Sequence, residues 1–186
     1  MKYCSSCGAA VVYRIPDGDS RHRFLCESCD TIHYQNPRVV TGCLVTWDDQ
    51  VLLCKRDIEP RRGFWTLPAG YLENGETAEA GAIRETWEEA CARVEVDDLY
   101  TLYSLPHISQ IYMFFRGRPM TPDYAAGAES QAVELFREDE IPWSELAFPV
   151  VRETLQHYFA DRVRQEFRVR SSSIIVDPAR RRLPSA

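Results

Sequence analysis

The sequence contains no long apolar run, and its longest uncharged apolar stretch is far shorter than the roughly 20 residues that a membrane helix needs. No basic segment followed by an apolar one opens the chain, so no secretory signal is expected and a cytoplasmic location is predicted. Basic residues are not in excess, because 22 Lys and Arg stand against 28 Asp and Glu, for a formal net charge of −6. This charge argues against a broad nucleic-acid partner, and the short apolar runs argue against a membrane partner. An acidic protein still binds polyphosphates when a divalent cation neutralises them.

The sequence also has no internal repeat, and 186 residues allow one ordinary domain plus a small module rather than two full domains. Seven cysteines are an odd number, which argues against the disulfide scaffold of a secreted protein. A hydrophobic share of 45% beside a charged share of 27% is typical of a globular chain. We therefore expect one folded domain together with a small accessory module.

Four cysteines form two C-x2-C pairs near the N-terminus: Cys4 with Cys7, and Cys26 with Cys29. Four thiolates close a tetrahedral Zn²⁺ site, and this paired spacing is a strong signal for a zinc ribbon. Segments 10–15 and 22–25, between the pairs, are predicted to be its strands. So short a module buries little apolar surface, so a structural Zn²⁺ would supply its folding free energy.

Two features of this ribbon leave alternatives open. His22 and His33 are possible spare ligands, but four sulfurs complete the site, so we expect them at the surface. A ribbon can also read nucleic acid. Here its arginines are offset by nearby acidic residues, which favours a structural role or a contribution to a neighbouring pocket or dimer contact.

The rest of the chain has the pattern of a mixed α and β body. Strands are predicted at residues 39–47, 51–56, 94–96, 111–115 and 133–136. Cys43 and Cys54 lie within the first two strands and are expected to be small buried side chains. Segment 57–75 is predicted to be a loop, because prolines and glycines interrupt it. The predicted boundaries are 1–36 for the ribbon, 37–160 for the body, and 161–186 for the end of the last helix and a basic tail containing Arg180, Arg181 and Arg182.

Two helices are predicted, one after Thr77 as N-cap and one over residues 149–167. On the first helix, Ile83, Thr86, Trp87 and Ala90 recur at helical spacing and predict the face that packs on the core. Glu85, Glu88 and Glu89 fall on nearly the opposite side. Such a triplet is either a solvated acidic face or a site for hard cations such as Mg²⁺, and the helix alone does not decide between them.

The loop before this helix favours the cation site. The positions Gly70, Glu76, Arg84, Glu85, Glu88 and Glu89, with Thr86 as a loose match, fit the pattern G-x5-E-x7-R-E-U-x-E-E-x-G-U, where U is aliphatic. This segment resembles the box of the Nudix hydrolases. The resemblance implies an α/β/α sandwich with a mixed sheet. Cys91 and Ala92 depart from the pattern's glycine and aliphatic residue, so the helix is expected either to run on or to end differently.

The resemblance also implies roles for individual residues. It implies that Glu85, Glu88 and Glu89 bind Mg²⁺ or Mn²⁺ and activate water, and that the Ala69 carbonyl is a further metal ligand. It also implies that Glu76 and Arg84 form a buried ion pair that orients the helix. Family members often use one more acid from outside the box. Glu129 is the candidate here, with Glu134 as the alternative or else an outward-facing strand residue.

A zinc ribbon ahead of such a box resembles the bacterial NADH pyrophosphatases, although their motif S-Q-P-W-P-F-P-Q-S has only fragments at 104–110. Residues 108–112 and 140–148 look closer to the plant FAD and ADP-ribose pyrophosphatases. Both resemblances imply a small-molecule nucleotide partner and a diphosphate bond whose hydrolysis releases AMP. Tyr71 would stack on the substrate base or merely cover the loop, and His107 is expected to be a loop residue.

Three further possibilities remain at this stage. A homodimer is possible. The first rival to an enzyme is a non-catalytic nucleotide-sensing module, whose mark would be the loss of the acids that are present here. The second rival is a zinc-ribbon nucleic-acid-binding protein, which would need basic and aromatic residues gathered on the ribbon.

Overall fold

The computed structural model describes residues 1–175, and the chain divides into two compact units, Met1–Pro37 and Arg38–Ala186. The small unit is a three-stranded antiparallel sheet in the order β1-β2-β3. Its strands are β1 (Val12–Arg14), β2 (Arg23–Leu25) and β3 (Ile32–His33). Only Cys4, Pro16, Leu25 and Cys26 are buried in this unit. So small a core fits the expectation that a metal stabilises it.

The large unit is built on an eight-stranded mixed sheet with the path β10-β5-β4-β9-β8-β11, to which β6 and β7 add beside β5 and β4. Its strands are β4 (Arg38–Trp47), β5 (Gln50–Arg56), β6 (Trp65–Thr66), β7 (Ala69–Tyr71), β8 (Val94–Leu105), β9 (Gln110–Pro119), β10 (Ser130–Phe136) and β11 (Arg170–Ser173). Its helices are α1 (Ala78–Ala90), α2 (Pro149–Arg164) and two 3-10 turns, Pro106–Ile108 and Trp143–Glu145. Neighbours β4 and β9 run parallel, as do β8 and β11, whereas β8 and β9 are antiparallel.

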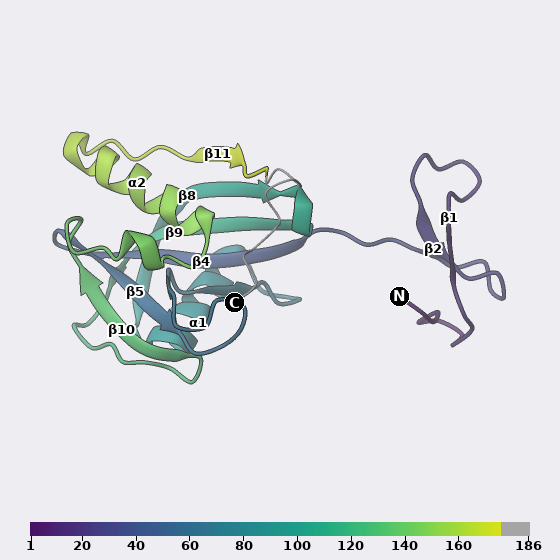
Figure 1. Cartoon of the computed structure of the whole chain (residues 1–186), viewed down its shortest axis with the longest axis horizontal. Coiled ribbons are helices and arrows are strands. Elements are labelled where there is room, and N and C mark those ends of the chain that lie inside the picture. Colours follow the sequence, from purple (N-terminus) through teal and green to yellow (C-terminus); the bar gives the residue numbers. More distant parts are fainter. Residues whose placement is uncertain (176–186) are drawn as a thin grey trace. The chain divides into compact units, whose positions relative to one another are not determined.

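The two long helices lie on opposite faces of this sheet, α2 above it and α1 below it in Figure 1. Two separate hydrophobic clusters reflect this arrangement. The first contains Leu155 and Phe159 of α2, and the second contains Ala82 and Ala90 of α1. The predicted α/β/α sandwich with a mixed sheet is confirmed. No helix among the described residues is long and apolar enough to cross a membrane.

Strands β4 and β5 pair with each other only next to their connecting turn, at Thr46 and Trp47. Farther along, β4 pairs with β7 and β5 pairs with β6. Segment 57–75, predicted to be a loop, therefore contains two short strands between the diverging β4 and β5. This insertion fixes the position of Gly70, which pairs with Thr41 of β4.

Several element lengths differ from the prediction. β8 extends far beyond the predicted 94–96, because its alternating polar and apolar residues continue as far as Leu105. α2 ends at Arg164 rather than 167, since Gln165 adopts a left-handed conformation with φ 53°. Part of the predicted tail is strand β11, held to α2 where Arg170 binds the buried carboxylate of Asp161 at 2.6 Å. The three arginines at 180–182 lie outside the described residues.

The predicted core-facing side of α1 is wrong at two positions. Ile83 and Trp87 are 39% and 48% exposed, whereas Ala82, Thr86 and Ala90 are fully buried. The hydrophobic pattern gives weight to large side chains, but here small residues face the sheet and let the helix approach it closely. The Cys43 thiol of β4 donates a hydrogen bond to the Ala82 carbonyl at 3.4 Å.

Both ends of α1 are defined by local hydrogen bonds. Thr77 is the N-cap, as predicted, and its side chain accepts a bond from the Ala80 amide. At the other end Cys91 takes the left-handed conformation with φ 49°, and its amide donates to the Trp87 carbonyl at 2.9 Å. The helix therefore ends where the family pattern has glycine, and the alternative that it runs on is wrong.

Candidate functional site

The four cysteines of the small unit come together as one cluster. Their sulfur atoms all lie within 4.8 Å of one another, with 3.7 Å between Cys4 and Cys29 and 3.4 Å between Cys7 and Cys26. A tetrahedral ion with Zn–S bonds of about 2.3 Å has sulfur-to-sulfur edges near 3.8 Å. The cluster therefore has the size and the donor atoms that Zn²⁺ requires.

Groups around Cys4 favour the ligating, ionised form of its thiol. The His33 Nε2 atom lies 3.3 Å from the Cys4 sulfur, which places this histidine beside the cluster rather than at the free surface. His22 is exposed and stacks on Tyr13, as expected for a surface residue. Burial opposes ionisation of Cys4, but hydrogen bonds from the Cys7 and Ser6 amides, together with His33, lower the pKa of its thiol to about 5.

In the large unit, the acidic residues of α1 face β7. A Cβ atom on Gly70 would lie 2.2 Å from Glu85 Oε2, so only glycine leaves room for this carboxylate. Side-chain exposure is 12% for Glu85 and 55% for Glu88, while Glu89 is 6% exposed overall. The predicted triplet therefore spans from the interior to solvent and is not a solvated acidic face.

Arg84 links the helix to the loop before it. Its guanidinium donates to Glu76 at 2.7 and 3.1 Å, to Glu85 at 2.7 Å and to the Tyr71 carbonyl at 3.1 Å. The hydrogen bonding between Arg84 and Glu76 lowers the pKa of Glu76 and raises the pKa of Arg84. The pair is in contact as predicted, but it is only partly buried, with 28% and 17% of the two side chains exposed.

Glu89 has the most strongly altered ionisation among these acids. Burial, with the nearby charges of Glu85 and Glu129, raises its pKa to about 8, against the opposing effects of the Ala69 amide and Arg56. The Ala69 amide donates to Glu89 Oε2 at 3.1 Å, so the peptide before Gly70 lies against the buried acid. Burial also raises the pKa of Glu85, and Glu88 and Glu129 add to the effect. Carboxylates whose charges repel one another in this way are stabilised by a divalent cation, and their hard oxygen atoms suit Mg²⁺ or Mn²⁺.

The loop before β10 brings Glu129 to this group. The Gly127 amide donates to the Glu89 carbonyl at 3.0 Å and the Ala125 amide to the Ala90 carbonyl at 2.9 Å, which fastens the loop to the end of α1. A Cβ atom on Gly127 would lie 1.8 Å from the Glu88 carbonyl oxygen, so the contact requires glycine. The charge of Glu129 acts on both Glu85 and Glu89.

Glu134, the alternative auxiliary acid, lies on the other face of the sheet. Val133 and Leu135 pack in the cluster on the α1 side, whereas Ala132 and Phe136 pack in the cluster on the α2 side. Side chains alternate along a strand, so Glu134 shares the α2 side and points away from the acids of α1. Glu129 is therefore the better candidate.

Tyr71 is 47% exposed and is held by two side chains. Its hydroxyl accepts hydrogen bonds from Gln110 at 2.9 Å and Arg38 at 3.3 Å, and the Arg38 guanidinium lies 5.2 Å from the ring centroid. A ring fixed in this way beside Gly70 is suited to stack on a base. The stacking role of Tyr71 stays a prediction.

Sequence reasoning missed Arg56, at the end of β5. It is only 8% exposed, and its charge acts on Glu89 and Tyr112. The available signal was a charged residue at the end of a strand whose middle, residues 51–54, is apolar.

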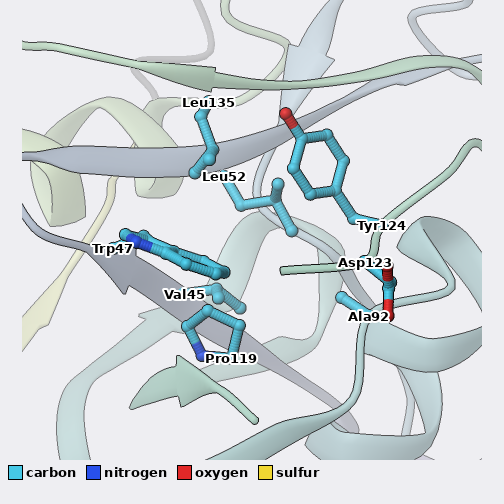
Figure 2. Close-up of a pocket in the computed structure, with 8 residues that line it drawn as sticks. All are labelled: Val45, Trp47, Leu52, Ala92, Pro119, Asp123, Tyr124 and Leu135. Carbon is cyan, nitrogen blue, oxygen red and sulfur yellow. The ribbon is translucent and has the colours of Figure 1, made fainter. Parts of the chain in front are cut away.

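A small hollow elsewhere on the α1 side is separate from the acids (Figure 2). Its lining combines aliphatic and aromatic side chains with one carboxylate: Val45, Trp47, Leu52, Ala92, Pro119, Asp123, Tyr124 and Leu135. Its volume reaches about 210 Å³ only with open solvent included, so the enclosed space is far smaller than that of an ordinary ligand pocket. None of the box residues lines it, so it is not the candidate active site.

Comparison with known proteins agrees with this geometry. Residues 2–35 match a family model described as Nudix N-terminal, a zinc ribbon, and residues 36–158 match the NUDIX domain. A solved NUDIX hydrolase from Nitrosomonas europaea is 52% identical, with a TM-score of 0.89 over 94% of this chain and 100% of that one.

Two curated relatives carry more specific names. An ADP-ribose pyrophosphatase of Methanocaldococcus jannaschii is 31% identical over 62% of this chain and 69% of its own length. A NAD-capped RNA hydrolase NudC of Edwardsiella ictaluri is 29% identical over 76% of this chain and 53% of its own length. The chain thus spans about half to two thirds of these relatives.

A mixed sheet between two helices, with the acidic residues of the box on one of them, is the architecture of a Nudix hydrolase domain. The chain belongs to the Nudix hydrolases, which act on phosphoric anhydrides, and it carries a zinc ribbon before that domain. Zinc is the structural ion of such a ribbon, and Nudix hydrolases use Mg²⁺ or Mn²⁺.

Proposed function

We propose that this chain hydrolyses the diphosphate bond of an ADP-containing dinucleotide, such as NADH or FAD, or of ADP-ribose, and releases AMP. The observation that carries the proposal is the group formed by Glu85, Glu88, Glu89 and Glu129 around Gly70, in which burial and mutual repulsion raise the pKa of Glu85 and Glu89. Two relatives whose names refer to ADP-ribose and to NAD support an ADP-linked diphosphate as the substrate class.

Each residue of the group has a distinct part in this proposal. Bound divalent cations would act as Lewis acids and lower the pKa of the attacking water. Glu85, Glu88 and Glu89 would supply the carboxylate ligands, together with the Ala69 carbonyl. Glu129 would supply a further ligand or act as proton acceptor, and the anchoring of its loop to the end of the same helix supports this choice.

Positioning comes from the neighbours of these acids. Arg84 holds Glu85 and the Tyr71 carbonyl at the same time, so the loop and the helix cannot separate without breaking that contact. Gly70 leaves the space that the Glu85 carboxylate occupies. The pair of Glu76 and Arg84 therefore supports the ligands and does not itself react.

The test is a panel of NADH, FAD, ADP-ribose, dinucleoside polyphosphates and NAD-capped RNA, each incubated with Mg²⁺ or Mn²⁺ and analysed for AMP or the decapped RNA. We expect release from at least one ADP-linked compound and its loss in Glu88→Gln. Glu134→Gln is the matched control, because that carboxylate lies on the other face of the sheet. Binding without turnover across the panel would instead favour a nucleotide-sensing module.

Two broader expectations belong with this proposal and stay predictions. A homodimer would be recognised by its mass in light scattering. A cytoplasmic location would be tested by fractionation of cells that produce the whole protein.

A further inference from the structure

Two side chains at the last strand of the small unit reach the cysteine cluster. The His33 Nε2 atom, on β3, lies 3.3 Å from the Cys4 sulfur. The Thr31 hydroxyl, just before β3, lies 3.1 Å from the Cys29 sulfur. The Cys26 amide donates to the Thr31 carbonyl at 3.0 Å, which ties the start of this strand to the second cysteine pair. Both contacts with sulfur are therefore part of the fold of the small unit.

The direction of the two hydrogen bonds follows from the state of the cysteines. A cysteine that binds Zn²⁺ does so as a thiolate, which has no proton and only accepts hydrogen bonds. In the zinc-bound ribbon the donors are therefore the Thr31 O–H group and a ring N–H group of His33. Each contact then joins a donor to a negatively charged sulfur, and hydrogen bonds of this kind are stronger than those between neutral groups.

The charge of the occupied site explains why such donors matter. Four thiolates carry −4 and one Zn²⁺ carries +2, so the net charge is −2. Cys4 is only 3% exposed, so water solvates its sulfur poorly and protein donors must replace that solvation. The Ser6 amide, at 3.4 Å, is a further donor to the same sulfur.

We infer that His33 and Thr31 are outer-sphere hydrogen-bond donors that stabilise the thiolates of Cys4 and Cys29 and thereby determine how tightly the ribbon holds Zn²⁺. Neither residue is a ligand, because four sulfurs complete the tetrahedron. Both act through the ligands that they contact, so they are positioning residues of the metal site. The inference goes beyond the proposed hydrolysis, because it concerns the small unit and its ion.

The first measurement is the affinity of the full chain for Zn²⁺, obtained by competition with a chromophoric chelator. Loss of an outer-sphere partner weakens metal binding by about 10- to 100-fold, and we expect a loss of this size in His33→Ala. Thr31→Val keeps the branched shape and removes the hydroxyl, so it should weaken binding in the same direction. His33→Gln retains an N–H donor and should recover part of the affinity.

The second measurement separates a hydrogen bond from general packing. Co²⁺ in place of Zn²⁺ gives a sulfur-to-metal charge-transfer band in the absorption spectrum. A thiolate that loses a hydrogen bond holds its electrons less tightly, so this band should move to lower energy in His33→Ala and in Thr31→Val. The ligand-field bands, which report four sulfur ligands, should keep their intensity in both variants.

His22→Ala is the matched control. His22 is the other histidine of the small unit, is exposed, and stacks on Tyr13 with 5.3 Å between the ring centroids. In the part of the chain that the structure describes, no hydrogen bond joins it to a cysteine sulfur. Its replacement should leave the Zn²⁺ affinity and the Co²⁺ charge-transfer band unchanged.

Wild-type affinity and an unshifted band in His33→Ala would overturn the inference. Weaker binding without a band shift would overturn it as well, because it would show that His33 only packs against the ribbon. If His33→Ala does not hold Co²⁺, Thr31→Val decides, and an unshifted band in that variant would overturn the inference. These measurements do not involve AMP release, so a failure of the proposed hydrolysis would leave the inference unaffected.

Discussion

Replacing Glu89 by Gln should change how stability depends on pH. Glu89 is 6% exposed, and its pKa is raised to about 8 in the folded, metal-free protein, mainly by burial. The ordinary pKa of a glutamate, 4.5, applies to the unfolded state. Between this pKa and the folded pKa of about 8, the folded state binds more protons than the unfolded state, so stability falls as pH rises through this window. The gap from 4.5 to about 8 corresponds to a loss of roughly 5 kcal/mol when the window has been crossed.

Glutamine keeps the shape of the side chain and an oxygen atom for the Ala69 amide, but it does not ionise. In EDTA, Glu89→Gln should therefore melt close to the wild type near pH 5 and well above it near pH 9. At roughly 2–4 °C per kcal/mol for a domain of this size, the difference near pH 9 should be about 10 °C or more. Mg²⁺ should raise the melting temperature of the wild type most at alkaline pH and that of the variant much less.

Tryptophan fluorescence is the suitable assay. All four tryptophans, Trp47, Trp65, Trp87 and Trp143, belong to the large unit, so the signal reports that unit alone. A melting-temperature difference that stays constant from about pH 5 to pH 9 would refute the reasoning about Glu89. Equal stabilisation of both proteins by Mg²⁺ would refute its role as a metal ligand.

Cys26→Ser should bind no Zn²⁺ in native mass spectrometry, where the wild type should bind one ion, and its small unit should unfold. The tryptophan fluorescence of the large unit should stay unchanged. Retained zinc in this variant would contradict the prediction. Glu88→Gln should lower AMP release by orders of magnitude and Glu129→Gln more mildly, while the melting temperatures of both variants stay level. Glu134→Gln should match the wild type. A larger loss of activity in Glu134→Gln than in Glu129→Gln would assign the auxiliary acid to Glu134. Gly127→Ala should displace the loop from α1 and lower kcat, because its Cβ would lie 1.8 Å from a carbonyl oxygen; unchanged kcat would show that the loop does not position Glu129.

The sequence was most informative where chemistry fixes spacing. The two cysteine pairs predicted a cluster that the structure brings within 4.8 Å, and the loop and helix of the box predicted the contact between Arg84 and Glu76. Both patterns are local, so a short stretch of chain contains the information. The assignment of Cys91 to the helix end was uncertain because a cysteine is rarely left-handed, and the structure shows that it does adopt this conformation.

The sequence was least informative where packing across the sheet decides the outcome. Ile83 and Trp87 are the largest apolar residues of α1, yet they face solvent because alanines and Thr86 allow closer approach to β4. The role of Arg56 depends on Glu89, Phe148 and Tyr112, which are far from it in the chain. The local signal, a charged residue at the end of β5, does not reveal those contacts.

The most direct test of the central claim is hydrolysis in ¹⁸O-labelled water. The wild type, with ADP-ribose, NADH or FAD and Mg²⁺, should release AMP, with one ¹⁸O atom in either AMP or the second phosphate product, and EDTA should stop the reaction. Absence of cleavage with every substrate, or AMP release that continues undiminished in EDTA, would contradict the account.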